Sequence, residues 1–172
     1  MGPDSNGEGR RAGIIGAPMT RDGAAGPGEA PLLTVRSLSI AFGETLVVDG
    51  ISFDVARGEI VALVGESGSG KTVTALSLLD LVPEPGRRTA GEVVFEGRDV
   101  ASLAPAELRR LRGGGIGFVF QEPGEALDPV QTIGSELVAV LRRHRGLSRD
   151  EARREAISWL SRVSLPDPES RM

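Results

Sequence analysis

The sequence predicts an α/β fold, and three observations support that prediction. Segments with strand patterns alternate along the chain with segments of helical spacing, an arrangement typical of α/β domains. The run from Ile60 to Val64 is apolar at every position, as expected of a strand buried on both faces of a parallel sheet. A glycine-rich turn, from Gly65 to Gly70, separates this run from a segment of helical spacing.

The first part of the chain predicts a leader followed by strands. Residues 1–30 consist mostly of Gly, Ala, Pro, Asp and Arg, and their apolar stretch is too interrupted for a signal peptide, so we expect a disordered leader. Order is expected to begin near Leu32, where "LLTVRSLSIAF" predicts a strand with three inward residues, Val35, Leu38 and Ile40. A second strand and a turn at Arg57-Gly58 then lead to the strand Ile60 to Val64.

In the middle of the chain, segments with helical spacing again alternate with segments that have strand patterns. "KTVTALSLLDLV" has helical spacing and is expected to end at Pro83 and Pro85. "GEVVFEGRDV" predicts a short strand pair around Gly97, and Pro105 opens a short helix, where its missing N–H costs nothing. "GIGFVFQ" predicts a further apolar strand.

The last part of the chain predicts two helices, "TIGSELVAVLRRHRG" and "LSRDEARREAISWLSRVSL". The second begins with a capping box, in which Ser148 is followed three residues later by Glu151. Its expected apolar face consists of Ala152, Ala156, Leu160 and Val163. His144, the single histidine, is expected at the surface of an arginine-rich helix end.

Composition excludes several classes of function. The formal net charge is −4, and acidic residues are interspersed among most arginine clusters, so we expect no nucleic-acid partner. The absence of cysteine excludes a disulfide framework and a thiolate metal site. No apolar run approaches the ~20 residues of a membrane span, so membrane association would require a partner.

The glycine-rich turn predicts a phosphate site. The segment "GESGSGKT" comprises Gly65, Glu66, Ser67, Gly68, Ser69, Gly70, Lys71 and Thr72, and it stands between an expected strand and helix, as a P-loop requires. The glycines let backbone N–H groups point at phosphate oxygens. Lys71 is the only lysine in the chain, and a compact ammonium on a flexible stem suits the outer phosphates better than an arginine fork. The Thr72 hydroxyl is expected to bind Mg²⁺. The alternative is a Gly/Ser-rich loop with a chance lysine.

Further motifs resemble one family. "LLTVRSLSIAFGETLVVDGISFDVARGEIVALVGESGSGKT", "GEVVFEGRDVASL" and "FVFQEP" are similar to the ATP-binding subunits of ABC transporters. "LDPVQTIG", "HRGLSRDEA" and "LPDP" resemble, more narrowly, the dipeptide, oligopeptide and nickel importers. The resemblance runs from Leu32 to about Pro168.

The resemblance implies a P-loop NTPase core of the ABC ATPase type. Residues 31–121 would form the N-terminal part of the ATP-binding domain, with an antiparallel β-subdomain, the P-loop and the strand before Gln121. Residues 122–172 would form the Q-loop and the beginning of a helical subdomain.

The resemblance also assigns two residues outside the P-loop, with ATP and Mg²⁺ as cofactors. Phe42 would stack on adenine; the alternative is a ring packed into the β-subdomain. Gln121 would approach Mg²⁺ and position the attacking water; the alternative is a polar residue ending a strand.

The implied partners are transmembrane permease subunits, a second ATP-binding subunit and, indirectly, an extracytoplasmic peptide-binding protein. The location would be peripheral, at the cytoplasmic face of the plasma membrane. Residues 122–134 would contact the permease, although Gly124-Glu125-Ala126 departs from the Met-Thr-Ser usual in importers.

Two parts of the family pattern have no match in these 172 residues: the Leu-Ser-Gly-Gly-Gln signature and the Walker B strand with its catalytic carboxylate. We therefore interpret the chain as the N-terminal portion of a peptide (or nickel) importer ATPase and expect it not to hydrolyse ATP alone. The alternative is a non-hydrolysing nucleotide-binding remnant or a permease-docking module. Without the Walker B half, the strands at Ile60–Val64 and "GIGFVF" would lack neighbours in the sheet.

Overall fold

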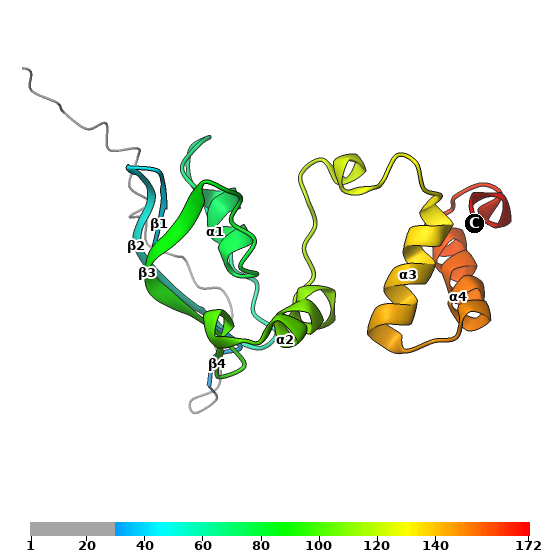
Figure 1. Cartoon of the computed structure of the whole chain (residues 1–172), viewed down its shortest axis with the longest axis horizontal. Coiled ribbons are helices and arrows are strands. Elements are labelled where there is room, and N and C mark those ends of the chain that lie inside the picture. The colour runs from blue at the N-terminus through cyan, green and yellow to red at the C-terminus, as the bar shows by residue number, and fades with distance from the viewer. Residues whose placement is uncertain (1–29) are drawn as a thin grey trace, which may run out of the picture. The chain divides into compact units, whose positions relative to one another are not determined.

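The computed structural model describes residues 30–172, and the chain forms two compact units, one ending at Leu108 and the other beginning at Arg109 (Figure 1). The leader expected at residues 1–30 lies outside the described residues, apart from Ala30. Each unit has a core of its own and is described separately.

The first unit contains a four-stranded antiparallel sheet with the order β2-β1-β3-β4. Its strands are β1 (Leu33–Phe42), β2 (Thr45–Val55), β3 (Gly86–Phe95) and β4 (Arg98–Asp99). The central strand β1 pairs with both β2 and β3. The three inward residues expected from the sequence, Val35, Leu38 and Ile40, are fully buried, which confirms that prediction. The other fully or nearly fully buried apolar side chains of this core are Val48, Val93, Leu79 and Val100.

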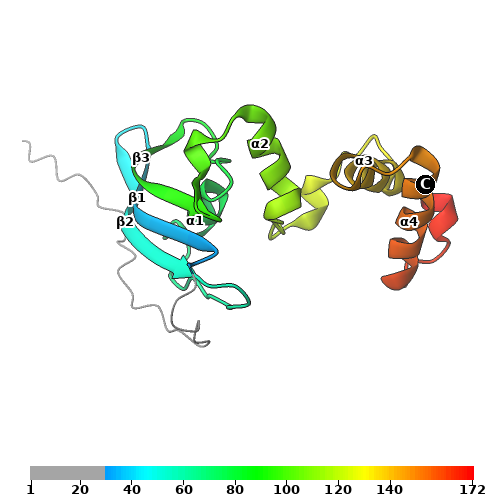
Figure 2. The same ribbon diagram turned by 90° about the horizontal axis from the view of Figure 1, so that it is seen from below.

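A short helix, α1 (Lys71–Ser77), lies alongside this sheet in both views (Figure 1, Figure 2). The helix is shorter than "KTVTALSLLDLV" suggested, because the chain leaves the helical conformation before the prolines. Asp80 adopts a left-handed φ of 52°, and Leu81 N donates to Leu76 O at 3.0 Å. This backbone closure is a Schellman motif, which satisfies carbonyls at a helix end.

The two apolar strands expected for a parallel sheet are absent, so that prediction is wrong for this structure. Residues 60–64 have no regular secondary structure, and Ile60 and Val64 are 87% and 72% exposed. In "GIGFVF", Ile116 makes one isolated bridge to Arg112, and Val119 is 86% exposed. A strand requires a hydrogen-bonding neighbour, and within residues 30–172 neither segment has one beyond the local bridge at Ile116. The expected burial of these two segments on both faces is not observed.

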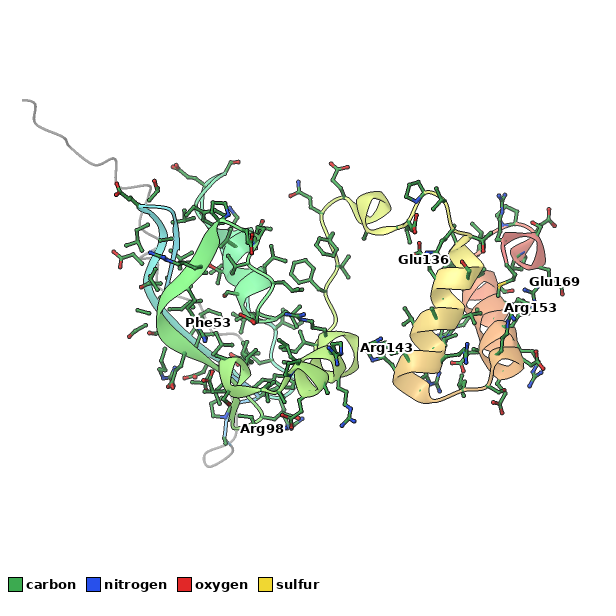
Figure 3. All side chains as sticks on the ribbon, in the orientation of Figure 1. Phe53, Arg98, Glu136, Arg143, Arg153 and Glu169 are labelled. Atoms are coloured by element: carbon green, nitrogen blue, oxygen red, sulfur yellow. The ribbon has the colours of Figure 1, made fainter. Side chains whose placement is uncertain are left out.

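The second unit is a pair of helices, α3 (Ile133–Arg145) and α4 (Arg149–Arg162), which run side by side (Figure 1). Their core is formed by Leu141, Ala152 and Ala156, and the two alanines let the helices approach closely. Thr132 caps α3, and the capping box predicted for α4 is present in full. Glu136 lies in the first turn of α3 (Figure 3) and accepts a hydrogen bond from Asp128 N at 2.6 Å.

Two expectations about this unit need correction. Val163 is 72% exposed, because α4 ends at Arg162 and Ser164 turns the chain with a left-handed φ of 58°. His144 is half-buried rather than a free surface residue. Its imidazole packs against Gly113, where a built Cβ would lie 3.2 Å from Nε2, so the missing side chain makes room for the ring.

The remaining helical segments are short: η1 (Val100–Ser102), α2 (Pro105–Arg110), η2 (Leu111–Gly115), η3 (Pro123–Ala126) and η4 (Pro168–Arg171). The short helix expected to open at Pro105 is confirmed. In the part of the chain that the structure describes, no helix has the length and hydropathy needed to cross a membrane.

Candidate nucleotide-phosphate site

The glycine-rich loop is anchored to the sheet at its C-terminal end. Gly70, the residue before α1, has a φ of 90°. A Cβ at this position would lie 3.0 Å from Val47 O and 3.0 Å from Val48 Cγ2. Any other residue would strain the backbone and crowd β2 at once. Gly70 therefore fixes where the loop ends and α1 begins.

The middle of the loop turns back on itself and faces open space. Ser69 N donates to Glu66 O at 3.2 Å, which closes the turn. Gly68 has a φ of 79°, and nothing lies within 4 Å of the position that its Cβ would occupy. A Cβ on Gly65 would lie 2.6 Å from Ser69 Oγ, so the two ends of the turn are in contact. The loop is thus a closed turn with room for a ligand beside Gly68.

Lys71 places its positive charge on this loop. Its Nζ donates to Gly65 O at 2.8 Å and to Glu66 O at 2.6 Å, and Ser69 Oγ lies 3.4 Å away. The ammonium thereby bridges the first residues of the loop to the first turn of α1. Anionic oxygens would compete well for this ammonium, because charge-assisted hydrogen bonds are stronger than bonds to neutral carbonyls.

Thr72 is exposed on the outer side of α1, and its hydroxyl makes no hydrogen bond with any described residue. Among residues 30–172 there is no cluster of three His, Cys, Asp or Glu side chains that could hold a metal by itself. Mg²⁺ bound with a nucleotide needs only one or two protein ligands, since phosphates and waters supply the others. The exposed Thr72 hydroxyl can serve as one such protein ligand.

Helix α1 is held under the loop by buried side chains. Thr74 and Ser77 are buried, and Thr74 N donates to Gly70 O at 2.8 Å, the first hydrogen bond of the helix. The Ser77 hydroxyl donates to Thr74 O at 2.6 Å. The Thr74 hydroxyl, which is also buried, has no hydrogen-bond partner among residues 30–172.

Phe42 lies at the end of β1, opposite Gly86 of β3, and its side chain is half-buried. Its ring packs beside Val82, so part of the ring is covered and part remains accessible. This placement is compatible with both readings of Phe42, and the stacking role stays a prediction.

Gln121 belongs to the second unit, where its side chain is exposed in an irregular segment. Glu66 and Ser67, which the sequence placed in the loop, are also exposed. The structure brings Gly65, Glu66, Ser69 and Lys71 into mutual contact. The role of Gln121 in metal and water binding remains a prediction.

Sequence reasoning missed two supports of the site. One is the contact of Gly70 with the Val47 carbonyl and the Val48 side chain, and the other is the pairing of Phe42 with Gly86, which places the Phe42 ring and the Val82 side chain over Gly86. The first could have been suspected from the strand pattern around Val48. No local signal pointed to the second, because strand pairing between β1 and β3 joins residues far apart in sequence.

Comparison with known proteins gives consistent results. The family model described as "ABC transporter" matches residues 48–172. The chain is 47% identical over 147 residues to a putative peptide import ATP-binding protein of Brucella abortus, covering 83% of this chain and 44% of the relative. It is 39% identical over 146 residues to the oligopeptide transport ATP-binding protein OppD of Bacillus subtilis, covering 82% of this chain and 41% of OppD. The chain thus spans less than half the length of these relatives.

Solved structures that are similar to this chain belong to the same family as these relatives. A dimeric ATP-binding cassette in a post-hydrolysis state, bound to ADP and Pi, has a TM-score of 0.64 at 27% identity, covering 78% of this chain and 58% of that one. An ATP-binding subunit of an ABC transporter has a TM-score of 0.60 at 28% identity, covering 81% of this chain and 52% of that one. The predicted fold, a partial ABC ATPase domain with an antiparallel sheet, is confirmed.

Proposed function

Because the chain belongs to the ABC transporter family, we propose that the loop from Gly65 to Thr72 binds the phosphates of ATP together with Mg²⁺. The observation that supports this most directly is the position of Lys71, whose ammonium lies on the loop carbonyls of Gly65 and Glu66. On binding, phosphate oxygens would replace those carbonyls as its partners. The metal would neutralise charge on the outer phosphates, with Thr72 as a protein ligand.

In this proposal the remaining site residues have separate roles. Gly70 and Gly68 hold the loop in a shape that no other residue adopts without strain, so that backbone N–H groups face the ligand. Phe42 stacks on the adenine ring. Gln121 approaches the metal and the attacking water in the complete ATPase.

A broader proposal is supported by the names of the relatives. Proteins named as peptide and oligopeptide import ATP-binding proteins share 39–47% of their aligned residues with this chain. We propose that this chain is part of an ATPase that energises peptide import. Permease subunits, a second ATP-binding subunit and, indirectly, a peptide-binding protein would be its partners. It would act at the cytoplasmic face of the membrane. In the same proposal, residues 31–121 belong to the N-terminal part of the ATP-binding domain, and residues 122–172 form the Q-loop and the beginning of the helical subdomain.

For the 172 residues alone, we propose nucleotide binding without turnover. Neither a Walker B carboxylate nor a signature loop occurs in them, and positioned carboxylates and oriented donors each contribute about 10²–10⁴-fold to such reactions. Phosphate release should not exceed that of the Lys71→Ala variant. Lys71-dependent turnover near ~1 s⁻¹, the low end of typical enzymes, would contradict this part of the proposal.

Isothermal titration of Mg-ATP tests binding. Lys71→Ala should weaken binding by about 10- to 100-fold, because it removes a charge-assisted contact to phosphate. Lys71→Arg should also bind poorly, because the planar fork does not fit over the loop. Arg153→Ala, which removes one positive charge from an exposed residue of α4, is the control and should bind as the wild type does. Equal affinity of all four proteins would refute the phosphate site.

A further inference from the structure

Gly86, the first residue of β3, is a glycine for a reason other than backbone conformation. Its φ does not lie in the left-handed region, so its backbone is one that any residue adopts. Yet a Cβ there would lie 2.6 Å from Phe42 Cζ and 2.8 Å from Phe42 Cε1. It would also lie 2.7 Å from Val82 Cγ1. Real Cβ atoms do not approach other atoms so closely, so the space above Gly86 belongs to the Phe42 ring and the Val82 methyl group.

The strand register makes this contact a fixed one. Phe42 pairs with Gly86 on one side and with Thr45 on the other. Because Phe42 lies between two strands, its Cα cannot shift without breaking ladder hydrogen bonds. The ring tip rests over Gly86, and Val82 bounds it at one side. The ring is only half-buried, so the remainder of its surface stays available to a ligand.

We propose that Gly86 and Val82 form a seat that fixes the orientation of the Phe42 ring, and that Gly86 is thereby a positioning residue for recognition of the nucleotide base. This inference rests on the proposed function, in which Phe42 stacks on adenine. Stacking requires the ring plane to be parallel to the base, and a ring held in that orientation beforehand loses less conformational entropy on binding. A side chain at position 86 displaces the ring from its seat without touching the phosphate loop.

The test compares ATP with tripolyphosphate, which retains the phosphates and lacks a base, by titration calorimetry in the presence of Mg²⁺. Phe42→Ala should weaken ATP binding by about 5- to 100-fold, the range expected for loss of one stacked base. Gly86→Ala should reproduce at least about 3-fold of that loss. Affinity for tripolyphosphate should be unchanged in both variants.

A double variant separates positioning from a general structural effect. In the Phe42→Ala background, Gly86→Ala should have no further effect on ATP affinity, because there is no ring left to displace. Gly117→Ala is the matched control: Gly117 also lacks a left-handed φ, and nothing lies within 4 Å of its built Cβ. This control should bind both ligands as the wild type does. Val82→Ala opens the seat without a clash and should also weaken ATP selectively, which keeps the proposal testable if Gly86→Ala does not fold.

Three results would overturn the inference. One is an equal loss of ATP and tripolyphosphate affinity in Gly86→Ala, and another is an undiminished effect of this substitution in the Phe42→Ala background. A third is wild-type ATP affinity in both Gly86→Ala and Val82→Ala while tripolyphosphate still binds, which would leave the phosphate site intact. Failure of the wild type to bind tripolyphosphate would overturn the proposed function, and this inference with it.

Discussion

Strand β1 and the segment Ile60–Val64 both contain residues that favour strands, but their structures are very different. Both are rich in β-branched and aliphatic residues. In β1, which lies between β2 and β3, Leu38 is fully buried. In the segment, Ile60 is 87% exposed and no described backbone hydrogen bond involves residues 60–64. The difference shows that strand propensity becomes a strand only where a neighbour supplies the hydrogen bonds and the packing.

The two ends of the glycine-rich loop differ in the same way: one end packs against a paired strand and the other does not. The loop is fixed at its C-terminal end, where Gly70 packs on Val47 and Val48. Its N-terminal end continues into the unpaired segment Ile60–Val64. Lys71 joins the two ends through its bonds to Gly65 O and Glu66 O. We infer that the C-terminal end, which packs on β2, sets the position of the loop. The hydrogen bonds of Lys71 then hold the N-terminal end, which has no strand beside it, in place.

The largest expected effect is a difference in the free energy of unfolding between a substitution in β1 and one in the segment Ile60–Val64. Leu38→Ala should destabilise the first unit by about 2–5 kcal/mol, because it empties a fully buried site. Ile60→Ala should change the free energy of unfolding by less than about 0.5 kcal/mol, as is usual for an exposed position. The measurement is urea denaturation followed by circular dichroism. Tryptophan fluorescence is unsuitable, because Trp159, the only tryptophan, lies in the second unit. A cost for Ile60→Ala similar to that of Leu38→Ala would show that residues 60–64 are packed in solution.

The contrast also explains which elements the sequence predicts well. The capping box at Ser148 and Glu151 and the buried alanines of α4 follow from residues three or four positions apart, and they were predicted correctly. The strand at Ile60–Val64 depends on partners far away in sequence, and its prediction was wrong. The glycine motif predicts a phosphate loop at Gly65–Thr72, and that role stays a prediction. The contacts that hold Gly70 and the Phe42 ring depend on strand pairing, which a single sequence does not reveal.

A smaller effect is expected in the well-packed region itself. The Thr74 hydroxyl is buried and finds no hydrogen-bond partner in the part of the chain that the structure describes, which costs free energy relative to water. Thr74→Val keeps the shape and removes the polar atom, so it should stabilise the first unit by about 1 kcal/mol. Ser77→Ala is the matched control, because its hydroxyl does donate, to Thr74 O; it should destabilise by about 0.5–1.5 kcal/mol. Both are measured by urea denaturation. Destabilisation by Thr74→Val would mean that the hydroxyl is satisfied in solution.

The smallest expected effect lies in the locally stabilised helix α4 and depends on pH. Hydrogen bonds from the Ser148 hydroxyl and the Ser148 backbone N–H to the Glu151 carboxylate lower the pKa of that carboxyl below its ordinary range. Because the pKa is lower in the folded than in the unfolded chain, the charged carboxylate contributes its full stabilisation above the unfolded pKa of about 4.3. That stabilisation is lost as the pH falls through the lower pKa of the folded chain.

Titration of the Glu151 carboxyl carbon by NMR is the direct measurement. In the wild type its midpoint should lie below that of an ordinary glutamate, and Ser148→Ala should move it upward, because the hydroxyl donor is the largest cause of the shift. The Glu151→Gln variant has an amide oxygen that can accept in the capping box, but it has no carboxyl group to titrate. Its free energy of unfolding should therefore not show this loss at low pH. The pKa of Asp128 is also lowered, by Gln131 and the Val130 N–H, but this contribution is common to both proteins and cancels in their difference. An unchanged midpoint in Ser148→Ala would show that the capping box is not formed in solution. The second unit would then depend on non-local packing, as β1 does.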